Sequence, residues 1–204
     1  MDNGIGYNSL LPVCITYSAN ENKRSFGVFS KRLLLSFLIV FSFFAFTGFL
    51  YSDLNYGVHD VFASFVARLN ASGYGELFGQ CASAVLFFVM PVALSGVTVF
   101  GKITSVLAYS AFAFAEGAVL SCSASLFVDD SLQRYMLASF ICSAMAVAGL
   151  FFCCGVFSFS KRAFAGKKEL FLLSPLLSYS VFIIISYSIN LLLLYIFFIL
   201  LKVK

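Results

Sequence analysis

Five apolar runs determine what this chain can fold into. They cover residues 33–51, 77–100, 103–128, 135–160 and 175–201. A helix needs ~20 mostly apolar residues to cross a bilayer, and these runs have that length. The last run is long for one span, but it has no internal Gly or Pro at which two spans could turn, so we expect one tilted helix. The pattern predicts an all-α, polytopic transmembrane helix bundle of about five spans, forming one domain over residues 33–204.

The composition supports a membrane protein over a soluble one. The chain is 61% hydrophobic and 11% charged, whereas soluble domains are ~45–50% apolar and ~25% charged. Its 27 Phe residues exceed what a water-excluding core of this size could hold, so the lipid bilayer is the expected partner of much of this surface. The segments outside the runs are shorter than the ~40 residues below which a domain rarely folds unaided.

Basic residues predict the orientation of the spans, because Lys and Arg collect on the cytoplasmic side. Nine of the 13 fall on one side if the N-terminus is inside: Lys23, Arg24, Lys31, Arg32, Lys102, Lys161, Arg162, Lys167 and Lys168. We therefore expect a multi-pass protein of the cell membrane, whose basic segment 1–32 is cytoplasmic and partly disordered. Five spans place the C-terminus outside, where Lys202 and Lys204 run against the charge rule.

The segment between the first two runs shows helical periodicity. Its apolar residues recur every three or four positions, at Val58, Phe62, Phe65, Val66 and Leu69. Asp60, Ser64 and Arg68 fall on other faces, and Gly73-Tyr74-Gly75 ends the pattern. This predicts a short amphipathic helix on the outer side. It would lie either on the membrane surface with its apolar side down or against its own bundle.

The residue types needed for several kinds of catalysis are missing from the runs. His59 is the only histidine and lies outside them, which argues against an intramembrane Ser–His pair and a His-based zinc site. No Walker sequence is present. The six Cys lack Cys-x-x-Cys spacing, and five lie in apolar runs, where buried thiols behave as small hydrophobes. We expect no catalytic residue, no cofactor, no metal site and no nucleic-acid partner.

One charged side chain, Glu116, stands in the middle of the third run. At 100° per residue it shares a face with mostly small or polar residues: Tyr109, Ser110, Ala113, Gly117, Leu120, Ser121 and Ala124. Small residues mark close helix contacts in membranes, and a charge at mid-bilayer costs at least ~2.5 kcal/mol. Glu116 therefore lies on the packed stripe and need not face lipid. Either it carries a proton or cation or meets a partner's polar group, or it ties its helix to a neighbour through Asn190 or a Ser.

The order of these parts resembles the stage II sporulation protein M family of spore-forming Firmicutes. A basic segment, one span and an amphipathic outer segment are followed by "SGVTVFGK", residues 95–102, by "FAEG", residues 114–117, and by the basic loop "FSKRAFAGKKE". The resemblance implies a non-enzymatic scaffold at the septal membrane during engulfment. It also implies that the chain recruits the peptidoglycan-degrading stage II sporulation proteins D and P. The outer face, with Asp129 and Asp130, would be the docking surface.

Two other classes of function remain open. Five helices, an intramembrane Glu and the basic loop 161–168 also suit a membrane subunit of a small-solute or ion transporter that couples to a separate ATPase. A membrane enzyme acting on lipid is the third alternative, although the sequence shows no charged catalytic cluster.

Overall fold

The computed structural model describes residues 31–127, 132–163 and 173–202, and no strand occurs among them. Its helices are α2 (Lys31–Leu54), α3 (Tyr56–Ala71), α4 (Tyr74–Gly96), α5 (Gly101–Phe127), α6 (Leu132–Ala163) and α7 (Leu173–Leu201). All except α3 are long and apolar enough to cross a membrane. The all-α bundle of five spans is thus confirmed. Most of the segment 1–32, and the loop with Asp129 and Asp130, lie outside the described residues.

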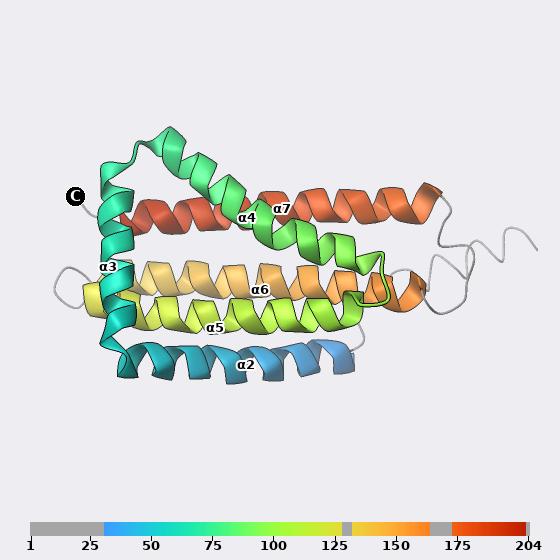
Figure 1. The fold of residues 1–204 in the computed structure, drawn as a ribbon, viewed down its shortest axis with the longest axis horizontal. Coiled ribbons are helices and arrows are strands. Elements are labelled where there is room, and N and C mark those ends of the chain that lie inside the picture. Colours follow the sequence, from blue (N-terminus) through green and yellow to red (C-terminus); the bar gives the residue numbers. More distant parts are fainter. Residues whose placement is uncertain (1–30, 128–131, 164–172, 203–204) are drawn as a thin grey trace, which may run out of the picture.

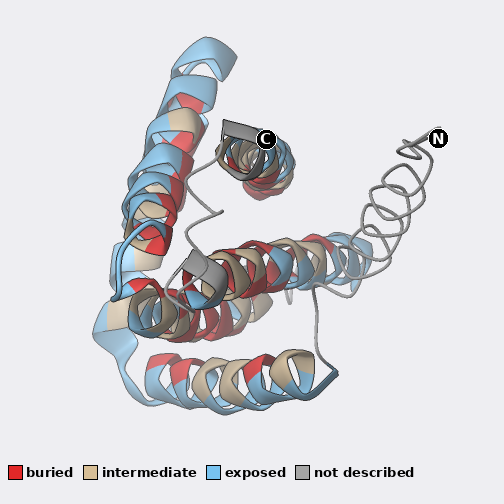
Figure 2. Ribbon diagram, turned by 90° about the vertical axis from the view of Figure 1, so that its right-hand side faces the viewer, coloured by how far each residue is buried: buried red, intermediate tan, exposed pale blue. Residues whose placement is uncertain are grey.

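Four spans lie side by side and the fifth crosses them. In Figure 1, α2, α5, α6 and α7 form a layer, α4 runs obliquely in front of it, and α3 lies across one end. Figure 2 shows α4 on one side of this layer, with buried residues on the surfaces that helices turn toward one another. α5 is central, because it packs against α2, α4 and α6.

The second span ends four residues before its apolar run does. The prediction extended it to Phe100, but α4 ends at Gly96 and residues 97–100 form the turn into α5. The Thr98 N–H bonds to the Ser95 carbonyl at 2.8 Å, and the Ser160 hydroxyl donates to the Thr98 carbonyl at 3.0 Å. Apolar side chains suit a turn in the membrane when its backbone groups are bonded, so hydropathy alone does not mark this boundary.

Tyrosine hydroxyls link the spans through backbone carbonyls. Tyr179 of α7 donates to the Ala93 carbonyl of α4 at 2.8 Å, and Tyr187 donates to Ala82 of the same helix at 3.2 Å. The Tyr179 ring lies against Gly96, where a Cβ would collide with its hydroxyl. In a bilayer, where lipid competes for apolar contact, such polar contacts and close approaches hold helices together. They place α4 across α7.

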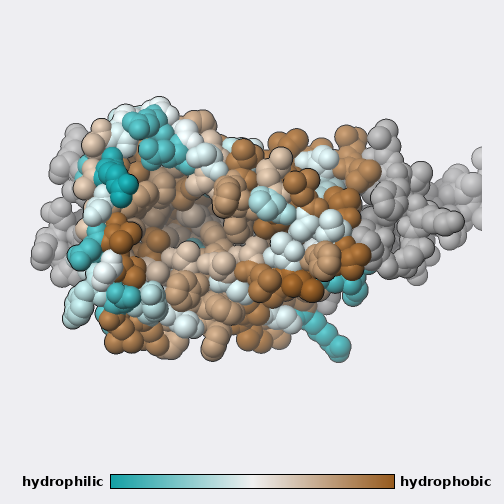
Figure 3. Space-filling model, in the orientation of Figure 1, coloured by the Kyte–Doolittle hydropathy of each residue, from teal (hydrophilic) through white to brown (hydrophobic). Residues whose placement is uncertain are grey.

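Helix α3 packs against the end of its own bundle, which decides between the two predicted placements. Leu69 is buried in a cluster with Phe197 and Leu201 of α7 and Ile141 of α6. The Phe65 ring lies 5.3 Å from the Phe198 ring, centroid to centroid. Figure 3 shows hydrophilic colour gathered at this end of the molecule, while apolar surface covers the middle. The amphipathic helix α3 therefore covers the end of the bundle.

Lys202 joins the C-terminal end of α7 to the connection between α3 and α4. Its ammonium donates a hydrogen bond to the Ser72 carbonyl and lies 4.6 Å from the centre of the Tyr74 ring. The Ser72 hydroxyl in turn donates to the Arg68 carbonyl at 2.8 Å. A basic residue at this end runs against the charge rule, and here it has a structural use, because it bonds the carbonyl of Ser72, the C-cap residue of α3.

Helices α2 and α5 approach one another at two glycines. A Cβ on Gly48 of α2 would collide with the backbone of Phe114, and one on Gly117 of α5 would collide with the backbone of Ala45. Each glycine thus admits the main chain of the other helix. Such contact, at small residues, is the main source of helix association in lipid.

We predict that Gly117→Ala and Gly48→Ala each destabilise the protein by about 1–3 kcal/mol, because the added methyl group forces the two backbones apart. Gly79→Ala is the matched control, since no atom lies within 4 Å of the Cβ it would add on α4. Thermal unfolding of the purified protein in lipid nanodiscs measures the effect. Equal melting temperatures for all three variants would contradict the close approach.

We predict that Lys202→Met loosens α3 without unfolding the bundle. A hydrogen bond to a charged group contributes about 1.5–3 kcal/mol, so amide hydrogen exchange in α3 should become about tenfold faster or more. Lys161→Met, an exposed lysine at the opposite end of the bundle, is the control and should leave α3 unchanged. Unaltered exchange in the Lys202 variant would show that apolar packing alone holds α3.

Candidate functional site

Glu116 is buried in the middle of α5 and is only 6% exposed. Neither of its carboxyl oxygens has a hydrogen-bond partner among the described residues. Ionisable groups within membrane spans normally pair with one another or with backbone carbonyls, and in the protein interior an unpaired polar group is costly. The isolated chain therefore leaves the bonding of this carboxyl incomplete.

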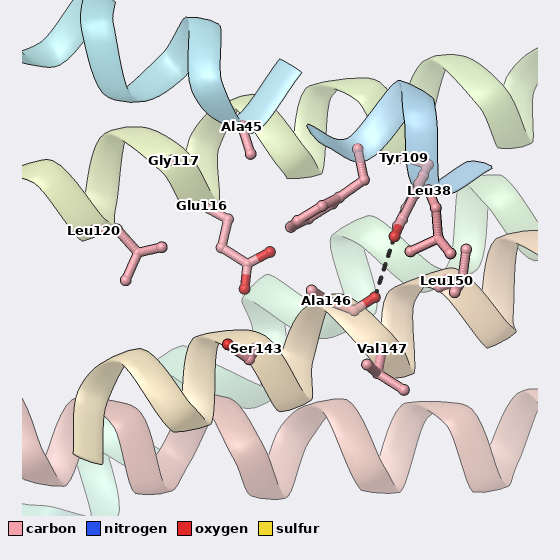
Figure 4. A pocket seen from close by; sticks show the side chains of 11 residues that line it. Leu38, Ala45, Tyr109, Glu116, Gly117, Leu120, Ser143, Ala146, Val147 and Leu150 are labelled. Atoms are coloured by element: carbon pink, nitrogen blue, oxygen red, sulfur yellow. Dashed lines mark hydrogen bonds between the residues drawn. The ribbon is translucent and has the colours of Figure 1, made fainter. Parts of the chain in front are cut away.

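The carboxyl faces a cavity of about 250 Å³ between α2, α5 and α6. In Figure 4 the Glu116 side chain reaches from α5 toward α6, with Ser143 and Ala146 on the facing side. The other lining residues are apolar or aromatic apart from Gly117: Leu38, Phe41, Ala45, Tyr109, Leu120, Val147 and Leu150. The Tyr109 hydroxyl already donates to the Ala146 carbonyl at 3.4 Å. One acidic group thus stands in an otherwise largely apolar chamber.

The structure places the other predicted residues of α5 in packing positions. Gly117 is the contact with Ala45 described above and lines the cavity beside Glu116. Ser110 and Ser121 are buried on the same helix. The Ser110 hydroxyl donates to the Val106 carbonyl at 2.9 Å, one turn back along α5. The polar stripe of α5 is therefore an internal face, as the sequence indicated, with Glu116 as its functional candidate.

Asn190 does not pair with Glu116. Its side-chain amide donates to the Ser186 carbonyl of its own helix at 2.8 Å. It lines a separate groove of about 620 Å³ between α6 and α7, together with Ser186 and apolar residues. Helix α6 borders both spaces, because Ser143 and Val147 line each of them. The expected tie from α5 through Asn190 is thus not formed.

The site offers acid–base or ion-pair chemistry at a single group. Among the described residues no three His, Cys, Asp or Glu side chains come together as metal ligands. The residues that sequence reasoning missed come from α2 and α6, chiefly Leu38, Ser143 and Val147. The glycines Gly48 and Gly117 were the only sequence signal that α2 would adjoin α5 at this level.

Comparison of the chain with models of protein families, with curated proteins and with solved structures finds no match. The site must therefore be interpreted from its own geometry.

We predict that Glu116→Met raises the melting temperature of the purified protein. The substitution replaces an unpaired buried polar group by an apolar one of similar length, and such changes are neutral or stabilising. Tyr109→Phe is the control in the same cavity. It removes a hydroxyl that has a partner and should lower stability by about 1 kcal/mol. A lower melting temperature for the Glu116 variant would show that this residue ties helices together.

Proposed function

We propose that this integral membrane protein is a non-enzymatic scaffold that binds a partner at the end of the bundle capped by α3. One observation supports this most directly. Helix α3 is held on the bundle by Leu69, Phe65 and Lys202, while its outward stripe stays exposed. That stripe consists of Asp60, Ser64 and Arg68, spaced four residues apart. A rigid helix with charges of both signs on its free face is suited to orienting a partner.

The charge distribution supports an extracytoplasmic position for this face. Among the basic residues that the structure describes, Arg68, Arg134 and Lys202 lie at the α3 end, whereas a larger group lies at the opposite end of the bundle: Lys31, Arg32, Lys102, Lys161 and Arg162. By the positive-inside rule that end is cytoplasmic, as is the N-terminus, and the cell membrane is the expected location. α3 then faces outward. α5 ends and α6 begins on the same side (Figure 1).

The resemblance to the stage II sporulation protein M family supplies the partner class. Under this proposal the chain recruits or positions membrane-anchored peptidoglycan hydrolases, similar to stage II sporulation proteins D and P, at the septal membrane during engulfment. No reaction is required of the chain itself. The charged stripe of α3 and the acidic loop would select the partner, and the five spans would hold both in the bilayer.

A transporter subunit is the second candidate, and the observation that favours it is Glu116. An unpaired carboxyl in a cavity within the spans is typical of ion and solute pathways. Such a subunit would work with a separate ATPase that binds the cytoplasmic side. The scaffold would bind its partner at the α3 end of the bundle, whereas the transporter subunit would bind its ATPase at the opposite end.

We predict that affinity purification of the tagged protein from its native host, in mild detergent, recovers peptidoglycan hydrolases. The double variant Asp60→Lys with Arg68→Glu reverses both charges of the stripe and keeps the net charge. It should reduce hydrolase recovery at least fivefold, because opposed charges at an interface suppress binding.

Lys161→Glu at the other end is the control and should leave hydrolase recovery unchanged. Mass spectrometry against matched amounts of membrane-inserted protein gives the measurement. Stoichiometric recovery of an ATPase or a solute-binding protein in place of hydrolases would support the transporter subunit and overturn the scaffold.

A further inference from the structure

We propose that the cavity between α2, α5 and α6 is a binding site for a small apolar amine whose ammonium group pairs with Glu116. The site lies inside the bundle, away from the α3 face, and the inference goes beyond the scaffold function without depending on it. Its evidence is the combination of cavity size, an unpaired buried carboxyl and a lining that is otherwise apolar.

The volume sets the size of the ligand. A dry cavity of about 150 Å³ in a protein core holds benzene, and the cavity at Glu116 measures about 250 Å³. One ring, or a branched aliphatic group of similar size, therefore fits together with a short chain that bears the polar group. Most drug-sized ligands occupy pockets of about 300–1,000 Å³, so the enclosed part of the ligand is smaller than these.

The carboxyl sets the charge of the ligand. An anion would be repelled by Glu116, and a purely apolar ligand would leave both carboxyl oxygens without a partner. A bare Mg²⁺ or Ca²⁺ ion takes six or more oxygen ligands, whereas Glu116, Ser143 and Tyr109 bring the only side-chain oxygens to the lining. An ammonium group matches this set, because it donates up to three hydrogen bonds.

Two further groups favour a cation that carries an apolar body. The Ser143 hydroxyl donates to the Ser139 carbonyl at 2.9 Å and keeps lone pairs that accept a bond from the ammonium. The Phe41 and Tyr109 rings lie 5.8 Å apart, centroid to centroid, and both line the cavity. Aromatic faces attract cations by about 0.5–2 kcal/mol and also bury the apolar part of the ligand.

The cavity opens toward the bilayer between α2 and α6. Leu38 of α2 and Val147 of α6 line it and are 47% and 51% exposed, so they stand at its mouth. Ser143, which lies on α6 beside Glu116 in Figure 4, is also exposed. An amine with an apolar body partitions into lipid and reaches this mouth laterally, whereas inorganic cations remain in water.

The test uses 2-phenylethylamine with the full chain in nanodiscs of zwitterionic phosphatidylcholine. 2-Phenylethanol, which has the same body without the charge, is the matched probe, and empty nanodiscs correct for partitioning. Isothermal titration calorimetry gives both dissociation constants. We expect saturable binding of the amine, at least tenfold tighter than that of the alcohol. Glu116→Gln should weaken the amine at least tenfold and leave the alcohol unchanged.

A second variant tests the cavity without touching the carboxyl. Val147→Phe places a larger side chain at the mouth and should abolish binding of both probes, while Val97→Phe, at an exposed position outside the lining, should not. Binding that is equal for amine and alcohol, or unchanged in the Glu116 and Val147 variants, overturns the proposal, as does binding no greater than in empty nanodiscs. Recovery of hydrolases at α3 is a separate measurement, so failure of either proposal is visible independently.

Discussion

The approach of α2 to α5 is the contact on which the candidate site depends. Lipid tails are as apolar as the side chains of a span, so burial in the usual sense does not drive two spans together. Dispersion between closely packed atoms does, and a gap of about 0.5–1 Å already loses a quarter to a half of it. Gly48 and Gly117 allow the backbones of α2 and α5 to meet, and in doing so they bring Leu38, Phe41 and Ala45 over the face that holds Glu116. Glu116, next to Gly117, is thereby removed from lipid, and its carboxyl faces α6.

Much of the fold could be predicted, because the summed hydropathy of a run of about 20 residues is enough to indicate a membrane span. The five runs and the periodic segment before the second one each specify a helix with little help from the rest of the chain. The end of α4 at Gly96 was not predicted. The turn residues Val97, Val99 and Phe100 are as apolar as those of a membrane span, so hydropathy continues past the end of the helix. Its position depends on hydrogen bonds to the turn, one of them from Ser160, which is distant in sequence.

The part of the site on α5 could be predicted from the sequence, but the lining from α2 and α6 could not. The periodicity of α5 placed Glu116 on the packed stripe, and its burial agrees. Which helices cover this stripe depends on how α2 and α6 pack, and small residues lie on several faces of these spans. The suggested tie to Asn190 illustrates the difficulty. Two polar side chains in apolar spans invite pairing, but Asn190 satisfies its amide within α7, one turn back at Ser186. Helical backbone carbonyls always compete for a buried donor.

Lys202 and Glu116 differ in whether their polar groups have partners. Lys202 finds a carbonyl and an aromatic ring, and both belong to the α3–α4 connection. Glu116 has no partner among the described residues. α3 contacts α2, α5 and α7, and its Leu69 also packs in a cluster with residues of α6, whereas the cavity is lined by α2, α5 and α6. A hydrogen bond joins His59 Nδ1 of α3 and the Ser125 hydroxyl of α5 at 3.2 Å. Ser125 lies nine residues along α5 from Glu116, or about 14 Å. Perturbations at sites without shared partners, more than about 7–10 Å apart, usually add. Leu120 of α5 is a shared partner here, because it lines the cavity and packs against the cluster that contains Leu69 of α3. α5 is therefore the helix through which occupancy of the cavity would couple to docking at α3.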